Sequence, residues 1–140
     1  MSGCTPEEDP PAAAAQAPSA AAGAPSPAAP SPSSVGLDAT TKKVCENLLD
    51  AVKETAANVA KAEKIGPPAG HFAVGAAYLA GSAQMSADSI GGTDERVQAA
   101  ADRVSTAMSD LDAAQQKDPE GKPSKAKLKA AVTELKAACS

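Results

Sequence analysis

The sequence contains almost no aromatic side chains: it has one phenylalanine, one tyrosine and no tryptophan among 140 residues. Its apolar residues are mainly alanine, valine and leucine, so a core built from them buries little area per residue. Small domains with so little apolar area to bury often depend on a covalent staple. The scarcity of aromatics therefore makes the cysteines important.

Histidine is nearly absent as well, because His71 is the only one in the chain. Without a second histidine, the common serine–histidine and cysteine–histidine nucleophile arrangements have no support. Asp110 and Asp112 lie two residues apart on a predicted helix, so they point away from each other and form no paired-acid site. The sequence therefore predicts that the protein is not an enzyme and holds no metal site.

Long apolar runs and an excess of positive charge are also missing. The nearest candidate for a membrane span is residues 69–87, which lack Asp, Glu, Lys and Arg but include a histidine, a glutamine and several glycines. We expect this segment to be a packed helix of a folded domain. The net charge of −4 argues against a nucleic-acid partner.

Proline is abundant at one end of the chain. Eight of the twelve prolines lie in residues 1–37, among alanine, serine and glycine. Proline recurs every few residues there, so no helix can extend beyond about one turn, and there is almost nothing to bury. We expect residues 1–37 to be a disordered tether and residues 38–140 to be the folded domain.

The predicted tether opens with Ser2-Gly3-Cys4, which resembles the end of a bacterial lipobox, where a signal peptidase cuts before the cysteine and the cysteine receives lipid. Two departures are visible: Met1 stands where leucine is commonest, and no basic-plus-apolar signal region precedes it. Whether a signal peptide was removed upstream of Met1 stays open. We expect a lipid on Cys4 that anchors the protein to the membrane; the alternative is a chance cysteine near a cytoplasmic N-terminus.

From residue 38 onward, apolar residues recur at the i, i+3, i+4, i+7 spacing of a buried helix face. The spacing predicts four helices, and turn residues with glycine or proline separate them. Their expected ranges are about 41–64, 69–90, 94–116 and 124–138.

Each predicted helix carries an apolar stripe that we expect to face the core. The expected N-caps are Asp38, Thr40 or Thr41 for the first helix, Thr93 for the third and Ser124 for the fourth. The stripe of the second helix consists of Phe72, Ala76, Leu79, Ala83, Ala87 and Ile90. That of the third consists of Val97, Ala100, Ala101, Val104, Met108 and Leu111.

Short loops force consecutive helices to run antiparallel, so the four helices should form an up-down-up-down bundle of the all-α class. In this topology the start of the first helix and the end of the fourth lie together. Cys45 and Cys139 occupy these two places, both on core-facing stripes, and we predict a disulfide between them. The alternative is two buried, reduced cysteines in a cytosolic protein. Since disulfides persist outside the cytosol, both this pair and Cys4 indicate export.

This organisation resembles that of small, uncharacterised exported lipoproteins of high-GC actinobacteria. The matching features are the Ser2-Gly3-Cys4 opening, the Ala/Pro/Ser spacer, the Lys-Lys-Val-Cys stretch that ends at Cys45 and the Leu-Lys-Ala-Ala-Cys stretch that ends at Cys139. The resemblance implies an extracytoplasmic location at the cell surface. It carries over no functional residue except the candidate lipid-bearing Cys4.

One side of the second predicted helix carries His71, Tyr78 and Met85 at intervals of seven. Each residue type serves as an axial ligand of haem iron, so one hypothesis is a small-molecule carrier, for example of haem. The alternative is that these residues form a second packing face of a charge-free helix. Ligands seven apart lie about 10 Å apart along the axis, too far to hold one ion together.

The fourth predicted helix is basic, and a basic strip suits anionic lipid or wall polymer. The alternative is a solvated face that the acidic third helix balances. We favour a tethered, non-catalytic interaction module of the cell envelope, with an unknown protein or wall-polymer partner, over the carrier. An exposed apolar patch on a solid core would favour the module, whereas a pocket beside His71 and Tyr78 would favour the carrier. The basic residues are Lys122, Lys125, Lys127, Lys129 and Lys136.

Overall fold

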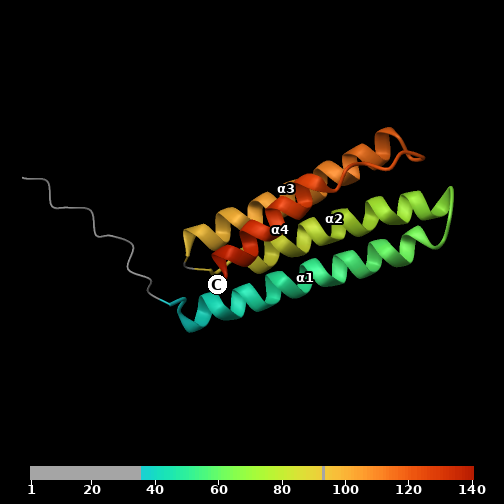
Figure 1. The fold of residues 1–140 in the computed structure, drawn as a ribbon. Helices are drawn as coiled ribbons and strands as arrows, with labels where there is room; N and C mark the ends of the chain where they lie inside the picture. The colour runs from blue at the N-terminus through green and yellow to red at the C-terminus, as the bar shows by residue number, and fades with distance from the viewer. Residues whose placement is uncertain (1–35, 93) are drawn as a thin grey trace, which may run out of the picture. The chain divides into compact units, whose positions relative to one another are not determined.

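The computed structural model describes residues 36–92 and 94–140, which form four helices (Figure 1). Successive helices run in opposite directions, so the predicted up-down-up-down bundle is confirmed. Each observed helix boundary lies within two residues of its predicted position. The helices are α1 (Ala39–Glu63), α2 (Ala69–Ser89), α3 (Glu95–Lys117) and α4 (Ala126–Ala138).

The ends of α1 and α2 follow local sequence signals. Asp38 is the N-cap of α1, and its Oδ1 accepts a hydrogen bond of 2.9 Å from the backbone N–H of Thr41. Gly66 follows α1 with φ +75°, and Gly91 follows α2 with φ +97°, a region that glycine enters without a steric penalty. These glycines let the chain reverse direction after each helix.

The starts of α3 and α4 differ from the prediction. Thr93 lies outside the described residues, and Asp94 is the N-cap of α3, accepting a 2.9 Å hydrogen bond from the backbone N–H of Arg96. The predicted N-cap Ser124 is wrong, because α4 begins only after Lys125 and no side chain caps it. The Ser124 hydroxyl lies 3.4 Å from the backbone nitrogen of Ala126, too long for a strong cap.

The core lies between all four helices, and it consists mainly of valine, leucine, methionine and alanine. α2 packs against both α1 and α3, and α4 packs against α3. Every residue of the predicted α3 stripe is buried. Leu48 of α1, Val97 and Val104 of α3, and Leu135 of α4 are all completely buried.

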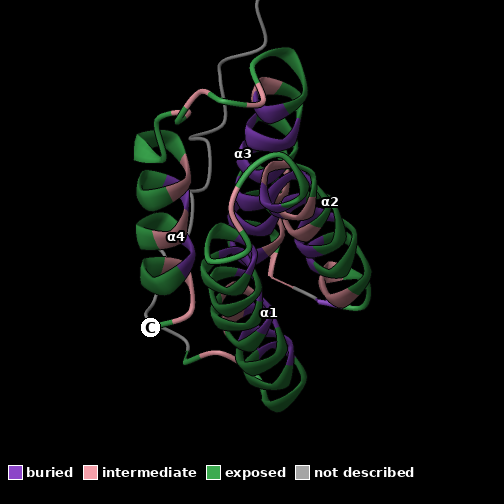
Figure 2. Ribbon diagram, turned by 90° about the vertical axis from the view of Figure 1, so that its right-hand side faces the viewer, coloured by how far each residue is buried: buried purple, intermediate pink, exposed green. Residues whose placement is uncertain are grey.

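The predicted stripe of α2 is wrong, because the structure turns that face toward solvent (Figure 2). Phe72, Leu79 and Ile90 are 69%, 55% and 81% exposed, and Ala76, Ala83 and Ala87 are exposed with them. The opposite face of α2 is buried instead. That buried face comprises Gly70, Val74, Gly75, Tyr78, Gly81, Ser82 and Met85.

Glycines explain this orientation, because they allow α2 to approach its neighbours more closely than any side chain would. A Cβ atom added at Gly81 would lie 2.3 Å from Thr55 Oγ1 in α1. One added at Gly75 would lie 2.8 Å from Asp112 Oδ1 in α3. A Cβ at Gly81 would require Thr55 to move, and one at Gly75 would displace the Asp112 carboxylate, so the glycine face of α2 fits against α1 and α3, and the larger apolar residues remain outside.

A small serine cluster joins α2 to α3 beside these glycines. The Ser82 hydroxyl lies 2.9 Å from the Ser105 hydroxyl and 2.8 Å from the Ser109 hydroxyl. These bonds satisfy a buried hydroxyl, because Ser82 is only 8% exposed. Polar pairing of small residues therefore contributes to this interface as well as apolar burial.

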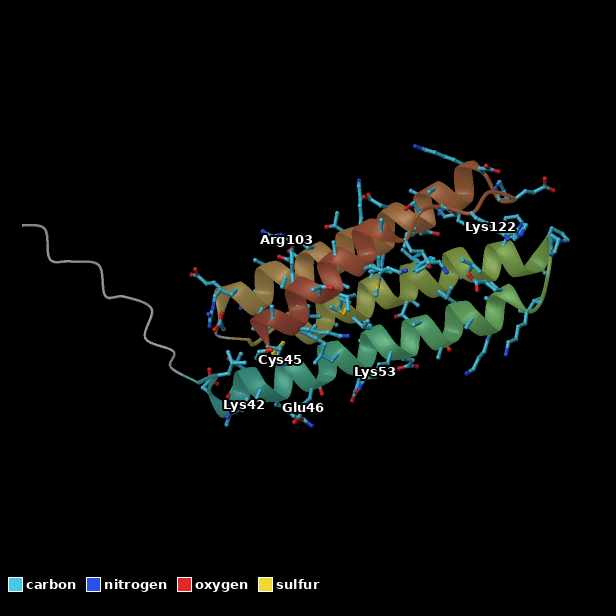
Figure 3. The ribbon with its side chains drawn as sticks, viewed as in Figure 1. Lys42, Cys45, Glu46, Lys53, Arg103 and Lys122 are labelled. Atoms are coloured by element: carbon cyan, nitrogen blue, oxygen red, sulfur yellow. A yellow bond between two sulfur atoms is a disulfide. The ribbon has the colours of Figure 1, made fainter. Side chains whose placement is uncertain are left out.

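The disulfide pair joins the two ends of the domain. The Sγ atoms of Cys45 and Cys139 are 2.07 Å apart and their Cα atoms 5.7 Å apart, so the predicted proximity is confirmed. Figure 3 shows the sulfur–sulfur bond where the end of α4 meets α1. The bond closes a loop between residues 94 positions apart in the sequence.

Reduction of the Cys45–Cys139 bond should strongly destabilise the domain. A loop of this length contributes about 4 to 5 kcal/mol in the chain-entropy model, equivalent to a fall of roughly 20 °C in Tm for a domain of this size. Thermal unfolding followed by circular dichroism, in a Cys4→Ser background, measures the change. The Cys45→Ser/Cys139→Ser double variant should have the Tm of the reduced protein, and reductant should not change that Tm. A reductant-independent Tm in the parent protein would contradict the expectation.

Gly81→Ala should destabilise the domain by about 1 to 3 kcal/mol, although alanine is the better helix former by about 1 kcal/mol. The added methyl meets Thr55, whose two nearest side-chain atoms lie 2.3 and 2.7 Å from it. Thr55→Ala removes both atoms, so Gly81→Ala should cost much less in that background. Denaturant unfolding of the four members of this double-mutant cycle gives the coupling. A more stable Gly81→Ala single variant would show that the observed orientation of α2 is incorrect.

Candidate functional site

The outward side of α2 carries a row of exposed apolar residues. Phe72, Ala76, Leu79, Ala83 and Ala87 lie on it in helical succession, and we call this set the α2 outer face. Phe72 and Leu79 are two of four exposed large hydrophobic residues among those described. The other two, Ile65 and Ile90, lie just beyond the opposite ends of the same helix.

Polar residues border the α2 outer face on both sides. Along α1, a shallow groove beside Ala80 is lined by Glu54 and Asn58. Along α3, a second groove beside Phe72 and Leu79 is lined by Gln115, Gln116 and the largely buried Asp112. The border therefore carries acidic and neutral groups near the apolar strip, as the rim of a protein interface does.

A cleft of about 350 Å³ opens at the end of the bundle where the α1–α2 and α3–α4 connections meet. Its volume falls in the lower part of the range of small-molecule sites. His71, Val74 and Tyr78 of α2 line it, together with Glu63 at the end of α1 and Lys125 before α4. The sequence pattern did not reveal this cleft, because it depends on how two irregular connections approach each other.

Electrostatic contacts organise the cleft around Lys125. Its Nζ lies 2.9 Å from Glu63 Oε1, and this hydrogen bond raises the pKa of Lys125. Burial raises the pKa of the Tyr78 hydroxyl, while the neighbouring Lys125 ammonium acts in the opposite direction. The cleft is thus lined by two lysines, Lys122 and Lys125, by two glutamates, Glu63 and Glu120, and by the Tyr78 phenol.

The three residues of the haem hypothesis occupy different environments. His71 is partly exposed at the cleft, and Tyr78 is 3% exposed at the same place. Met85 is completely buried in the core two turns further along α2. Within residues 36–92 and 94–140, no cluster of three His, Cys, Asp or Glu side chains could bind a metal ion.

The basic residues around α4 are partly balanced by acidic partners. Lys125 pairs with Glu63 at 2.9 Å, and Lys127 lies 3.7 Å from Asp110 of α3. Arg103 of α3 reaches in the other direction to Glu134 of α4. The contacts agree with a solvated, charge-balanced face, although exposed pairs of this kind contribute little to stability.

The predicted lipid attachment residue, Cys4, lies outside the described residues, as does most of the predicted tether. In the part of the chain that the structure describes, no helix combines the length and apolar character that crossing a membrane requires.

Titration of Tyr78 should report the environment of the cleft. It is the only tyrosine and the chain has no tryptophan, so phenolate absorbance follows this residue alone. Folded protein should titrate above the value of about 10 for an exposed phenol, and unfolded protein at about 10. Since the folded state holds this proton more tightly, the associated stability is present below about pH 10 and is lost as the pH rises through the folded pKa.

Two variants sharpen this measurement. Lys125→Ala should raise the Tyr78 pKa further, because it removes the cation that favours the phenolate. Lys129→Ala, an exposed lysine elsewhere on α4, should leave the pKa unchanged. Equal titration midpoints in the folded and unfolded protein would contradict the burial of Tyr78.

With this geometry in place, comparison with known proteins adds no relative: no protein-family model, no curated protein and no solved structure gives a significant match to the chain.

Proposed function

We propose that the protein is a tethered, non-catalytic interaction module of the cell envelope that binds an apolar protein surface through its α2 outer face. The observation that carries this proposal is the exposure of Phe72 and Leu79 on a helix that has no charged residue from Ala69 to Ala87. Burial of one such side chain contributes about 1.5 to 3 kcal/mol of favourable free energy, and the isolated domain does not gain it because both side chains stay exposed. Extended apolar surfaces of this kind mark binding sites.

A protein partner fits the border of this face better than a lipid surface does. Helices that lie on anionic membranes carry lysine and arginine beside their apolar residues. The α1 border carries Glu54, Asn58 and Lys61, and the groove along α3 is lined by Gln115 and Gln116 beside the largely buried Asp112. An apolar strip whose rim mixes both signs of charge with neutral groups suits a protein surface.

The proposed envelope location rests on two cysteine features. A bond between Cys45 and Cys139 persists in oxidising compartments outside the cytosol. Ser2-Gly3-Cys4 resembles a lipid attachment sequence, and a proline-rich segment follows it directly. Lipid on Cys4 would hold the domain at the outer surface of a membrane, with residues 1–37 as the spacer.

A small-molecule carrier is the second candidate, and the cleft of about 350 Å³ beside His71 and Tyr78 favours it. The Lys125–Glu63 pair and the Tyr78 hydroxyl would orient a small polar ligand above an apolar floor. Native mass spectrometry of protein purified from its own host separates the candidates. A retained ligand that Lys125→Ala abolishes would support the carrier.

Photo-crosslinking tests the docking face. A photoreactive amino acid at Phe72 should form protein adducts in host membranes, because this position is exposed on the α2 outer face. The same amino acid at Thr133, an exposed position on α4, is the matched control and should form few adducts. Gel electrophoresis and mass spectrometry identify the products. Similar yields at both positions, or none at either, would count against the α2 outer face as a docking site.

Detergent partitioning tests the anchor. In the native host, with an upstream signal segment supplied, the full chain should enter the detergent phase because bacterial lipoproteins carry more than one acyl chain. Cys4→Ser should move the protein to the aqueous phase without changing its Tm. Retention of Cys4→Ser in the detergent phase would refute the lipid on this residue and leave the helical domain unaffected.

A further inference from the structure

Over its first four residues, the α2 outer face alternates large and small apolar side chains. Phe72 and Leu79 are the large members, and Ala76 and Ala83 are the small ones. Their spacing of four, three and four residues is that of a helix–helix seam, in which side chains of one helix fill gaps on another. The domain itself leaves this seam uncovered.

When the same row of residues runs in the opposite direction, its large side chains lie opposite the small ones of the first row. If a second α2 runs antiparallel and the two helices cross between positions 77 and 78, Phe72 meets Ala83 of the second copy and Leu79 meets Ala76 of the second copy. Each large side chain then lies over a small one.

We propose that the partner of the α2 outer face is a second copy of this chain, bound through antiparallel pairing of the two α2 helices about a two-fold axis. This proposal rests on the proposed docking role of the same face and names its occupant. A two-fold contact of this kind uses one self-complementary patch on both copies.

The charges around the face are compatible with a second copy. Each chain has a net charge of −4, so two copies repel unless they meet where charge is absent. No aspartate, glutamate, lysine or arginine occurs from Ala69 to Ala87. The helix can therefore approach its twin without bringing like charges together along the seam.

The α1 border adds complementary charges. Asn58 lines the groove beside Ala77, so it lies level with the crossing point. Glu54 is four residues away on one side, and Lys61 is three residues away on the other, on the same side of α1. These offsets correspond to roughly 6 and 4.5 Å along the helix.

An antiparallel two-fold axis keeps the α1 borders of the two copies next to each other and reverses one of them. Glu54 of one copy then comes level with Lys61 of the other, and the contact occurs twice by symmetry. Two opposite-charge pairs therefore lie along the α1 side of the apolar seam, whereas a parallel arrangement would lose this match. Complementary rim charges of this kind fix the register of an interface.

The size of the contact sets its strength. α2 has 21 residues, and one face of a helix of this length buries roughly 400 Å² per copy, about half of the 800 Å² per partner of a standard stable complex. We therefore expect a weak, concentration-dependent dimer. Attachment of both copies to one membrane would raise their effective concentration and favour pairing.

Sedimentation velocity of the full chain tests this proposal, with Cys4→Ser in every sample so that no intermolecular disulfide forms. Between about 10 µM and 1 mM the protein should pass from monomer to dimer. Ala76→Lys alone and Leu79→Glu alone should each weaken self-association at least tenfold. Positions 76 and 79 are both exposed, so neither substitution should change the circular dichroism spectrum or the Tm of the domain.

Mixing the two variants tests the register. An equimolar mixture of Ala76→Lys and Leu79→Glu should regain the dimer, because position 76 meets position 79 of the second copy and the two new charges attract. A mixture of Ala76→Lys with Ala83→Glu should remain monomeric, because position 83 meets Phe72 instead.

A parent protein that stays monomeric at about 1 mM, or a first mixture that fails to pair, would overturn the dimer. Crosslinks from Phe72 that contain only a different protein would also overturn it, yet they would leave the docking role of the α2 outer face intact. Absence of any adduct at Phe72 would remove the docking role itself.

Discussion

The close contact of α2 with α1 and α3 is the constraint on which the rest of the structure depends. Gly75 and Gly81 bring the α2 backbone close to the side chains of Asp112 and Thr55, so that a Cβ atom at either position would force its neighbour to move. Once the glycine face is inside, helical geometry places Phe72 and Leu79 on the opposite side. The packing of α2 against α1 and α3 thus determines both which residues form the core and which apolar residues remain on the surface.

The sequence predicted the helices, their order and the cysteine pair with little error, because these follow from local signals. Glycine and proline fix where helices end, and the i, i+3, i+4 spacing of α3 leaves a single choice of buried face. Val97, Val104 and Leu111 alternate with charged residues such as Asp102 and Arg103. The periodicity there is unambiguous.

The buried face of α2 could not be predicted in the same way. This helix has apolar or small residues all round, so the helical spacing of apolar residues fits more than one side, and the predicted stripe with Phe72 and Leu79 is the exposed one. The packing instead depends on how closely backbones approach, which glycines decide and a hydrophobicity pattern does not record. The cleft at Lys125 was missed for a related reason, since its lining comes from two connections whose mutual approach only the fold specifies.

The bond between Cys45 and Cys139 also determines how the domain bears mechanical load. Residue 38 precedes Cys45 by only seven positions, and Cys139 directly follows the last residue of α4. A pull applied between residue 38 and Cys139 would therefore pass through the sulfur–sulfur bond and bypass the helices between them. Only the first turns of α1 can peel away under such a force. Under this force the bundle would keep its shape, and the α2 outer face would keep its geometry.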